Sequence, residues 1–200
     1  MRITIRSIIL LSVAWLGLWV TGQTNADDKA KGGEVKVGYP APAFQATDDQ
    51  GNTWKSSDHV GKKILVVYFY PADLTGGCTK QACSYRDDMS KLTEKGVEVV
   101  GISGDSAKNH EVFKKVEKLN FTLLADEDGS VAKKFGVPVG KGGDFNTKDA
   151  EGNPIKLMRG VTTQRWTFVI NKDGKIIYKN IKVNPAQDSK QILEVIEKQS

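Results

Sequence analysis

Residues 69–83 read FYPADLTGGCTKQAC and join a predicted buried strand to a predicted helix. The strand is the apolar run over residues 64–68, and Pro71 ends it because proline has no N–H to donate to a sheet ladder. The Gly76-Gly77 pair indicates a turn. From Cys78 onward, apolar residues recur at spacings of three and four, which predicts a helix. We therefore expect Cys78 at the amino end of a helix, just beyond the carboxyl end of a central strand.

A cysteine at that position is placed to react. The unpaired N–H groups and the positive dipole end of a helix favour the thiolate over the thiol, and the thiolate is the nucleophile. Thr75 lies three residues earlier, so its hydroxyl is expected to reach the sulfur or a bound oxygen. Pro71 is expected to shield the sulfur from water. The alternatives are structural: Thr75 as a turn or capping residue, and Pro71 as a strand terminator.

The pattern Pro71-x-x-x-Thr75-x-x-Cys78 resembles the active-site signature of the peroxiredoxins. Cys83, five residues after Cys78, is similar to the second cysteine of their bacterioferritin-comigratory (Q-type) subfamily. Further matching motifs follow in the expected order between Gly38 and the C-terminal helix. They are Ala41-Pro42-x-Phe44, Gly51, Gly61-Lys62, Cys78-Thr79-Lys80 and Arg165-x-Thr167-Phe168. One position departs from the pattern: the subfamily usually has proline after the threonine, where this chain has Gly76, but no reactive group is lost.

The resemblance implies a thiol peroxidase that reduces hydrogen peroxide and organic hydroperoxides. Cys78 would be the peroxidatic nucleophile and pass through a sulfenic acid. Cys83 would be the resolving thiol, and a thioredoxin-like protein would reduce the resulting disulfide. The subfamily also implies a monomer with no metal, haem or flavin.

The resemblance places the family's catalytic arginine at Arg165, at the head of a predicted strand. A guanidinium there would stabilise both the thiolate and a developing oxyanion. Two alternatives stay open: Arg165 as a solvated charge at the rim of the sheet, and Arg159 as the functional arginine.

The chain contains only two cysteines, so any intramolecular disulfide joins Cys78 to Cys83. Residues five apart in a helix lie about 8.5 Å apart at Cα, whereas a disulfide bridges at most about 7 Å. The bond therefore requires the first turns of the helix to unwind. This favours a redox-active pair, and a structural disulfide is the alternative.

Residues 1–26 are predicted to be a cleaved signal peptide. Arg2 and Arg6 give a positive start, residues 8–20 are apolar, and Thr24-Asn25-Ala26 offers small residues at a cleavage site. A helix over residues 8–20 would span about 20 Å, less than the roughly 30 Å hydrocarbon core of a bilayer. We expect export to the periplasm or the cell exterior, with no stable membrane association after cleavage. An uncleaved membrane anchor is the alternative.

The rest of the chain predicts an α/β protein with a thioredoxin-like fold, in which a central mixed sheet is flanked by helices. Residues 27–37 are charged and contain glycine, so we expect a flexible linker before a single catalytic domain over residues 38–200. Residues 136–160 are rich in glycine and polar residues and are expected to form a long loop. Strands are expected at 44–47, 64–68, 97–103, 121–124, 166–171 and 176–180, and helices from residue 78 and at 107–119, 129–135 and 187–198.

The net charge and the placement of the two histidines argue against nucleic-acid binding and against a metal site. The formal net charge is +5 and the lysines are scattered, which disfavours nucleic acid as a partner. His59 is expected in a polar turn and His110 on an exposed helix face, and neither has metal-ligand spacing from the cysteines. Two alternatives remain, an exported thioredoxin-fold thiol–disulfide oxidoreductase and a copper-handling protein. The first usually carries Cys-x-x-Cys, whereas here four residues separate the cysteines. Peroxide consumption, insulin reduction and stoichiometric copper binding would distinguish the three.

Overall fold

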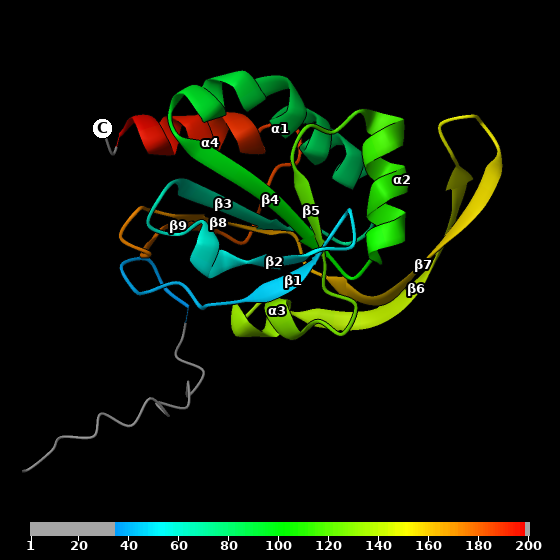
Figure 1. Ribbon diagram of the computed structural model, residues 1–200, viewed down its shortest axis with the longest axis horizontal. Coiled ribbons are helices and arrows are strands. Elements are labelled where there is room, and N and C mark those ends of the chain that lie inside the picture. Colours follow the sequence, from blue (N-terminus) through cyan, green and yellow to red (C-terminus); the bar gives the residue numbers. More distant parts are fainter. Residues whose placement is uncertain (1–34, 199–200) are drawn as a thin grey trace, which may run out of the picture. The chain divides into compact units, whose positions relative to one another are not determined.

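A mixed sheet of seven strands forms the centre of the fold in a computed structural model that describes residues 35–198 (Figure 1). Its strands lie in the order β2-β1-β5-β4-β3-β8-β9. Strands β3, β4 and β5 are parallel to one another, and the outer strands pair antiparallel. The bounds are β1 Gln45–Asp48, β2 Thr53–Lys55, β3 Ile64–Phe69, β4 Val97–Ser103, β5 Thr122–Ala125, β8 Trp166–Ile170 and β9 Ile176–Asn180.

Helices cover both faces of this sheet, which confirms the predicted α/β architecture. Helices α1, α2 and α4 lie together on one face, and the short α3 lies on the other (Figure 1). A single 3₁₀ turn, Ser56–Asp58, follows β2. The helices are α1 Gly76–Glu94, α2 Ala107–Glu117, α3 Ser130–Lys134 and α4 Asp188–Glu197.

Strand β3 shows why the centre of the chain reads as a continuous apolar run. Successive side chains of a strand point to opposite faces, so Leu65 and Val67 enter the cluster beside α3. Val66 and Tyr68 enter the cluster beneath α1 and α4. All four side chains are fully buried, because both faces of the sheet are covered.

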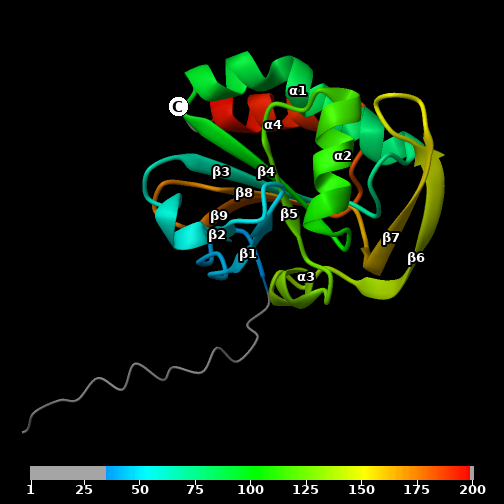
Figure 2. The same cartoon turned by 45° about the vertical axis from the view of Figure 1, so that its right-hand side comes forward.

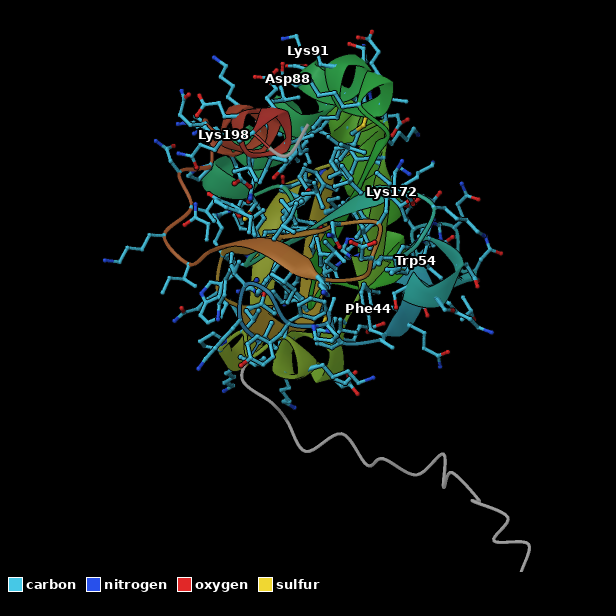
Figure 3. The ribbon with its side chains drawn as sticks, turned by 90° about the vertical axis from the view of Figure 1, so that its left-hand side faces the viewer. Phe44, Trp54, Asp88, Lys91, Lys172 and Lys198 are labelled. Atoms are coloured by element: carbon cyan, nitrogen blue, oxygen red, sulfur yellow. The ribbon has the colours of Figure 1, made fainter. Side chains whose placement is uncertain are left out.

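Figure 3 labels residues of two contacts that lie on opposite faces of the sheet, Phe44 with Trp54 and Asp88 with Lys91. Phe44 packs against Trp54 with ring centroids 5.2 Å apart, which closes the α3-side cluster near β2. On the other side, Asp88 of α1 accepts a hydrogen bond from Ser189 of α4 at 2.9 Å and pairs with Lys91 at 2.9 Å. Asp88 therefore ties the helix that carries Cys78 to the C-terminal helix.

Most of residues 136–160 form a β-ribbon, so the predicted loop is wrong. Strands β6 Val139–Lys148 and β7 Pro154–Thr163 pair antiparallel, and Figure 2 shows the ribbon, in yellow, alongside α2. Gly152 does lie in the turn of this ribbon, but Gly142 and Gly160 lie inside its strands, where backbones approach closely, and these glycines misled the prediction. A Cβ on Gly160, for example, would lie 2.2 Å from the carbonyl oxygen of Glu127.

The chain before Val35 lies outside the described residues, and so do the predicted signal peptide and most of the predicted linker. Val35 itself is buried, and its carbonyl accepts a hydrogen bond from Lys179 at 2.9 Å. Over residues 35–198, none of the helices combines the length and apolar character needed to cross a membrane.

Candidate active site

Cys78 lies in the first turn of α1, as the sequence predicts. Strand β3 ends at Phe69, the helix begins at Gly76, and the Cys78 side chain is 1% exposed. The predicted turn at Gly76-Gly77 is wrong, because both glycines are already helical. The chain reverses earlier, at Leu74, whose φ of 56° lies in the left-handed region.

Arg165 contacts the Cys78 sulfur. Strand β8 pairs antiparallel with β3, with Trp166 opposite Phe69, which places the residue before β8 beside the carboxyl end of β3. Arg165 Nη2 donates to Cys78 Sγ at 3.2 Å, and Nη1 donates to Gln81 Oε1 at 2.6 Å. The contact places a positive charge where it can stabilise negative charge that develops at the sulfur.

Arg159, the alternative, lies in the β6–β7 ribbon and donates from Nε to Thr162 Oγ1 at 2.8 Å. Of the two arginines, Arg165 is the one that the structure brings to the sulfur.

The buried carboxylate of Asp188 positions Arg165 through Gln81. The sequence analysis did not identify Asp188. Gln81 Nε2 donates to Asp188 Oδ2 at 2.6 Å, and Tyr85 and Thr167 each donate to the same oxygen at 2.8 Å. Burial raises the pKa of Asp188, while these three hydrogen bonds act to lower it. Gln81 was detectable because it lies one helical turn after Cys78 on the same face. Asp188 was not, since it lies at the start of a helix more than a hundred residues later.

Thr75 and Pro71 lie in the loop that leads into α1. Thr75 is the N-cap residue, but its Oγ1 donates to the carbonyl of Ala72 at 2.9 Å and not to the Cys78 sulfur. While the hydroxyl donates its one hydrogen to Ala72, it can only accept a hydrogen bond from a bound peroxide. Pro71 is half-buried. The carbonyl before it, on Tyr70, accepts a hydrogen bond from Thr163 at 2.8 Å.

Cys83 lies apart from this group, on the second turn of α1. Both cysteines are free thiols, and Cys83 Sγ donates to Glu117 Oε2 at 3.5 Å. Burial raises the pKa of the Cys83 thiol, Arg86 lowers it and Glu117 raises it further, and the net direction is upward. The structure therefore brings Arg165 to Cys78 but leaves Cys83 in its helix.

The AhpC/TSA family model matches residues 37–179. The chain belongs to this family. The chloroplastic peroxiredoxin Q of Oryza sativa subsp. japonica is 42% identical over 164 residues, which cover 82% of this chain and 66% of the rice protein, just under two thirds of its length.

Solved structures of this family share its fold. The BcpB peroxidoxin of Mycobacterium tuberculosis superposes with a TM-score of 0.67 at 29% identity, covering 82% of this chain and 97% of that one. A peroxiredoxin Q mutant of Xanthomonas campestris superposes with a TM-score of 0.64 at 25% identity, covering 78% and 92%. The predicted thioredoxin-like fold is confirmed.

In this member of the family, a buried polar cluster anchors the loop before Cys78. Tyr70 donates from its hydroxyl to Asp73 Oδ1 at 2.7 Å, and His110 Nδ1 lies 2.8 Å from Asp73 Oδ2. The Asp73 N–H donates to Asp105 Oδ2 at 3.0 Å. These contacts hold Leu74 in a left-handed conformation that costs about 1–2 kcal/mol for a residue with a Cβ.

His110 was predicted to be exposed, and that prediction is wrong. Its side chain is fully buried because the inward face of α2 carries both His110 and Phe113, three residues apart. Burial alone lowers the pKa of His110, but Asp73 and then Asp105 raise it, and the net direction is upward. Burial raises the pKa of Asp105, and the Asp73 charge raises it further. Tyr70 is also buried, and its hydroxyl contributes a hydrogen bond to this cluster.

The other histidine, His59, stacks on Trp54 at 4.3 Å, and its Nδ1 lies 3.0 Å from Glu98 Oε2. Across residues 35–198 no three or more His, Cys, Asp or Glu side chains are grouped so that they could hold a metal ion.

Proposed function

We propose that this chain is a thiol-dependent peroxidase that reduces hydrogen peroxide and organic hydroperoxides. The observation that carries the proposal is the 3.2 Å contact from Arg165 Nη2 to Cys78 Sγ at the amino end of a helix. The cation and the unpaired N–H groups at the start of the helix lie where they can stabilise the charge that develops as the sulfur reacts. The relatives named peroxiredoxin Q support the same chemistry.

In the first step the Cys78 thiolate attacks one oxygen of the peroxide. An S–O bond forms as the O–O bond breaks, and the departing oxygen takes a proton and leaves as water or an alcohol. Sulfur is oxidised to sulfenic acid and the peroxide is reduced. Arg165 and the first N–H groups of α1 stabilise the developing charge, and Thr75 accepts a hydrogen bond from the peroxide hydroxyl.

In the second step the Cys83 thiol loses its proton and attacks the Cys78 sulfenic acid as the thiolate. An S–S bond forms, the S–O bond breaks, and the thiol proton leaves with the hydroxyl as water. Helix α1 is continuous from Gly76 to Glu94, so its first turns must unwind before the sulfurs meet. A thioredoxin-like dithiol protein then reduces the disulfide and is itself oxidised. We place the protein in antioxidant defence on this basis.

Mass spectrometry after one equivalent of hydrogen peroxide tests this cycle. We expect wild type to lose two hydrogens as a Cys78–Cys83 disulfide forms. Cys83→Ser should gain one oxygen and then a second with excess peroxide. Cys78→Ser should consume no peroxide while keeping its fold. Undiminished peroxide consumption by Cys78→Ser would overturn the assignment.

Amide hydrogen exchange tests the unwinding step. We expect faster exchange over residues 77–87 in the oxidised form, with β8 unaffected as an internal reference. Equal exchange in the reduced and oxidised forms would make Cys83 a bystander and assign resolution to an external thiol.

We also propose that residues 1–26 are removed as a signal peptide and that the mature protein acts as an exported monomer. The positive start and the short apolar stretch over residues 8–20 support export. The intact mass of protein recovered outside the cytoplasm should correspond to a chain that begins near residue 27. A full-length chain in the membrane fraction would support the anchor instead.

A further inference from the structure

Three contacts join the second and third turns of α1 to the carboxyl end of α2 and the residues that follow it. Cys83 Sγ donates to Glu117 Oε2 at 3.5 Å, and Arg86 Nη1 donates to the backbone carbonyl of Glu117 at 2.6 Å. Asn120 Nδ2 donates to the carbonyl of Arg86 at 3.2 Å. We call these four residues the α1–α2 clasp.

We propose that Glu117 is a positioning residue for the resolving step: it holds the Cys83 thiol in the helix and delays its attack on the Cys78 sulfenic acid. The inference rests on the proposed function, because it assigns Glu117 a role only if Cys83 is the resolving thiol. Nothing in the peroxide-reducing step uses Glu117, which lies at the last position of α2.

The contact suppresses the reactive form of the resolving cysteine. Only the thiolate attacks a sulfenic acid, and a thiol whose hydrogen is donated to a carboxylate is held in the unreactive form. Burial raises the pKa of the Cys83 thiol, and of the charged groups around it Arg86 lowers the pKa while Glu117 and Asp87 raise it. The net direction of the Cys83 pKa is upward, which disfavours the thiolate while Cys83 keeps its helical position.

The same contact opposes unwinding. Cys83 must leave its place beside Glu117 before it can reach Cys78, so the hydrogen bond is one of those lost when the turn opens. Arg86 and Asn120 bond to backbone groups, and both bonds survive a change of the Glu117 side chain. Removing the Glu117 charge therefore makes it easier for Cys83 to leave its helical position, while the Arg86 and Asn120 contacts of the clasp are kept.

Suppression of the Cys83 thiolate and resistance to unwinding both slow disulfide formation. Glu117→Gln removes the charge but keeps the shape, so disulfide formation should become faster by about three- to tenfold, the range expected for one modest hydrogen bond. A general-base role would have the opposite sign, because a base would speed removal of the Cys83 proton.

The rate of the resolving step also determines how much of Cys78 is over-oxidised by peroxide. A slower resolving step leaves the Cys78 sulfenic acid exposed to a second peroxide, which adds another oxygen and gives the sulfinic acid. Glu117→Gln should therefore accumulate less sulfinic acid than wild type at the same excess of peroxide.

Rapid-quench alkylation followed by mass spectrometry measures both steps in one sample. Glu111→Gln is the matched control, since Glu111 lies on the same helix and its partner is the exposed Lys108. We expect faster disulfide formation in Glu117→Gln alone, with sulfenic acid formed at the wild-type rate in both variants. Unchanged resolution in Glu117→Gln would overturn the proposal, and slower resolution would replace it with the general-base role.

A second measurement does not depend on peroxidase activity. In a Cys78→Ser background Cys83 is the sole cysteine, and its alkylation by iodoacetamide can be followed across pH. Glu117→Gln should shift the alkylation profile to lower pH, and Glu111→Gln should leave it in place. If wild type forms no sulfenic acid but this shift is seen, the proposed function fails while the contact stands. If the shift is absent, the inference fails whatever the activity.

Discussion

The two cysteines lie five residues apart on one helix, yet the structure holds them in different ways. Cys78 is 1% exposed and contacts Arg165, which is tied through Gln81 to the buried Asp188. Cys83 is partly exposed, and its sulfur contacts Glu117. The sulfur that must meet peroxide in a fixed geometry is braced by buried groups. The sulfur that must leave its helix is held by contacts that water can replace at little cost.

The bracing of Cys78 continues into the loop before it. Asp73 receives hydrogen bonds from Tyr70 and His110, and its own N–H donates to Asp105. A buried cluster of this kind is stable only while every partner is present, so it fixes the loop in one conformation. The comparison therefore predicts that substitutions of the buried groups that hold Cys78 and its loop strongly change stability or the rate of Cys78 oxidation. Substitutions around Cys83 should change stability little.

The largest effect should come from Asp188→Ala. The substitution leaves the donors of Gln81, Tyr85 and Thr167 buried without their acceptor, and at about 1 kcal/mol or more for each donor the loss is about 3 kcal/mol. Urea unfolding measures the change. Asp87→Ala removes an exposed carboxylate near Cys83 and should stay within about 0.5 kcal/mol of wild type. Similar losses of unfolding free energy in Asp188→Ala and Asp87→Ala would contradict the difference between the surroundings of Cys78 and those of Cys83.

The sequence was sufficient for the parts of the site that depend on local pattern. The apolar run over residues 64–68 and the helical spacing after Cys78 placed the cysteine correctly at a helix amino end. Arg165 was predicted from the resemblance to the peroxiredoxins, not from local pattern alone, and antiparallel pairing of the strand that follows it with β3 accounts for its contact with the sulfur.

The sequence was not sufficient for the partners that come from distant elements. Asp188 and Glu117 contact the site from α4 and α2, and no spacing along the chain relates them to the cysteines. His110 was misplaced because a polar residue on an amphipathic helix reads as exposed until its buried partner, Asp73, is known. The ribbon over residues 139–163 was missed because glycine and threonine occupy half-buried positions of β6, at Gly142, Gly143 and Thr147, so that strand shows no clear alternation of apolar and polar residues.

The next effect in size concerns Arg165, whose removal should act on Cys78 and spare Cys83. Arg165→Ala loses a charge-assisted contact with the sulfur and should slow oxidation of Cys78 by about tenfold or more. Competition kinetics with peroxide measures the rate, and the alkylation rate of Cys83 serves as the internal reference. Arg159→Ala should leave Cys78 oxidation unchanged. If Arg159→Ala is the impaired variant instead, the catalytic role moves to the ribbon.

A smaller effect should appear in the pH dependence of stability. The pKa of His110 is raised above its unfolded value of about 6.5, so the folded state holds the proton more tightly. The stabilisation is fully present below the unfolded pKa and is lost as pH rises through the folded pKa. Relative to His110→Gln, wild type should therefore lose free energy of unfolding as pH increases over this range. Urea unfolding at several pH values measures the difference, and a constant difference would contradict charge-based bracing of the loop.

The smallest effect should separate two neighbouring glycines at the start of α1. A Cβ on Gly77 would lie 3.3 Å from Arg165 Nη2, so the guanidinium must shift by a few tenths of an ångström, whereas a Cβ on Gly76 meets nothing within 4 Å. Alanine favours a helix over glycine by about 1 kcal/mol, so both substitutions gain helix propensity.

Only the alanine at Gly77 should disturb the chemistry. A misplacement of about 1 Å can slow a reaction by about a hundredfold, so a shift of a few tenths of an ångström should slow Cys78 oxidation by about two- to fivefold in Gly77→Ala. Gly76→Ala should be stabilised by about 0.5–1 kcal/mol with an unchanged rate. Urea unfolding of the two variants measures the gain from helix propensity. Competition kinetics measures the effect of moving the Arg165 guanidinium on Cys78 oxidation. Equal oxidation rates in both would show that Arg165 tolerates the shift, and the bracing of Cys78 would then be looser than the contact with Gln81 implies.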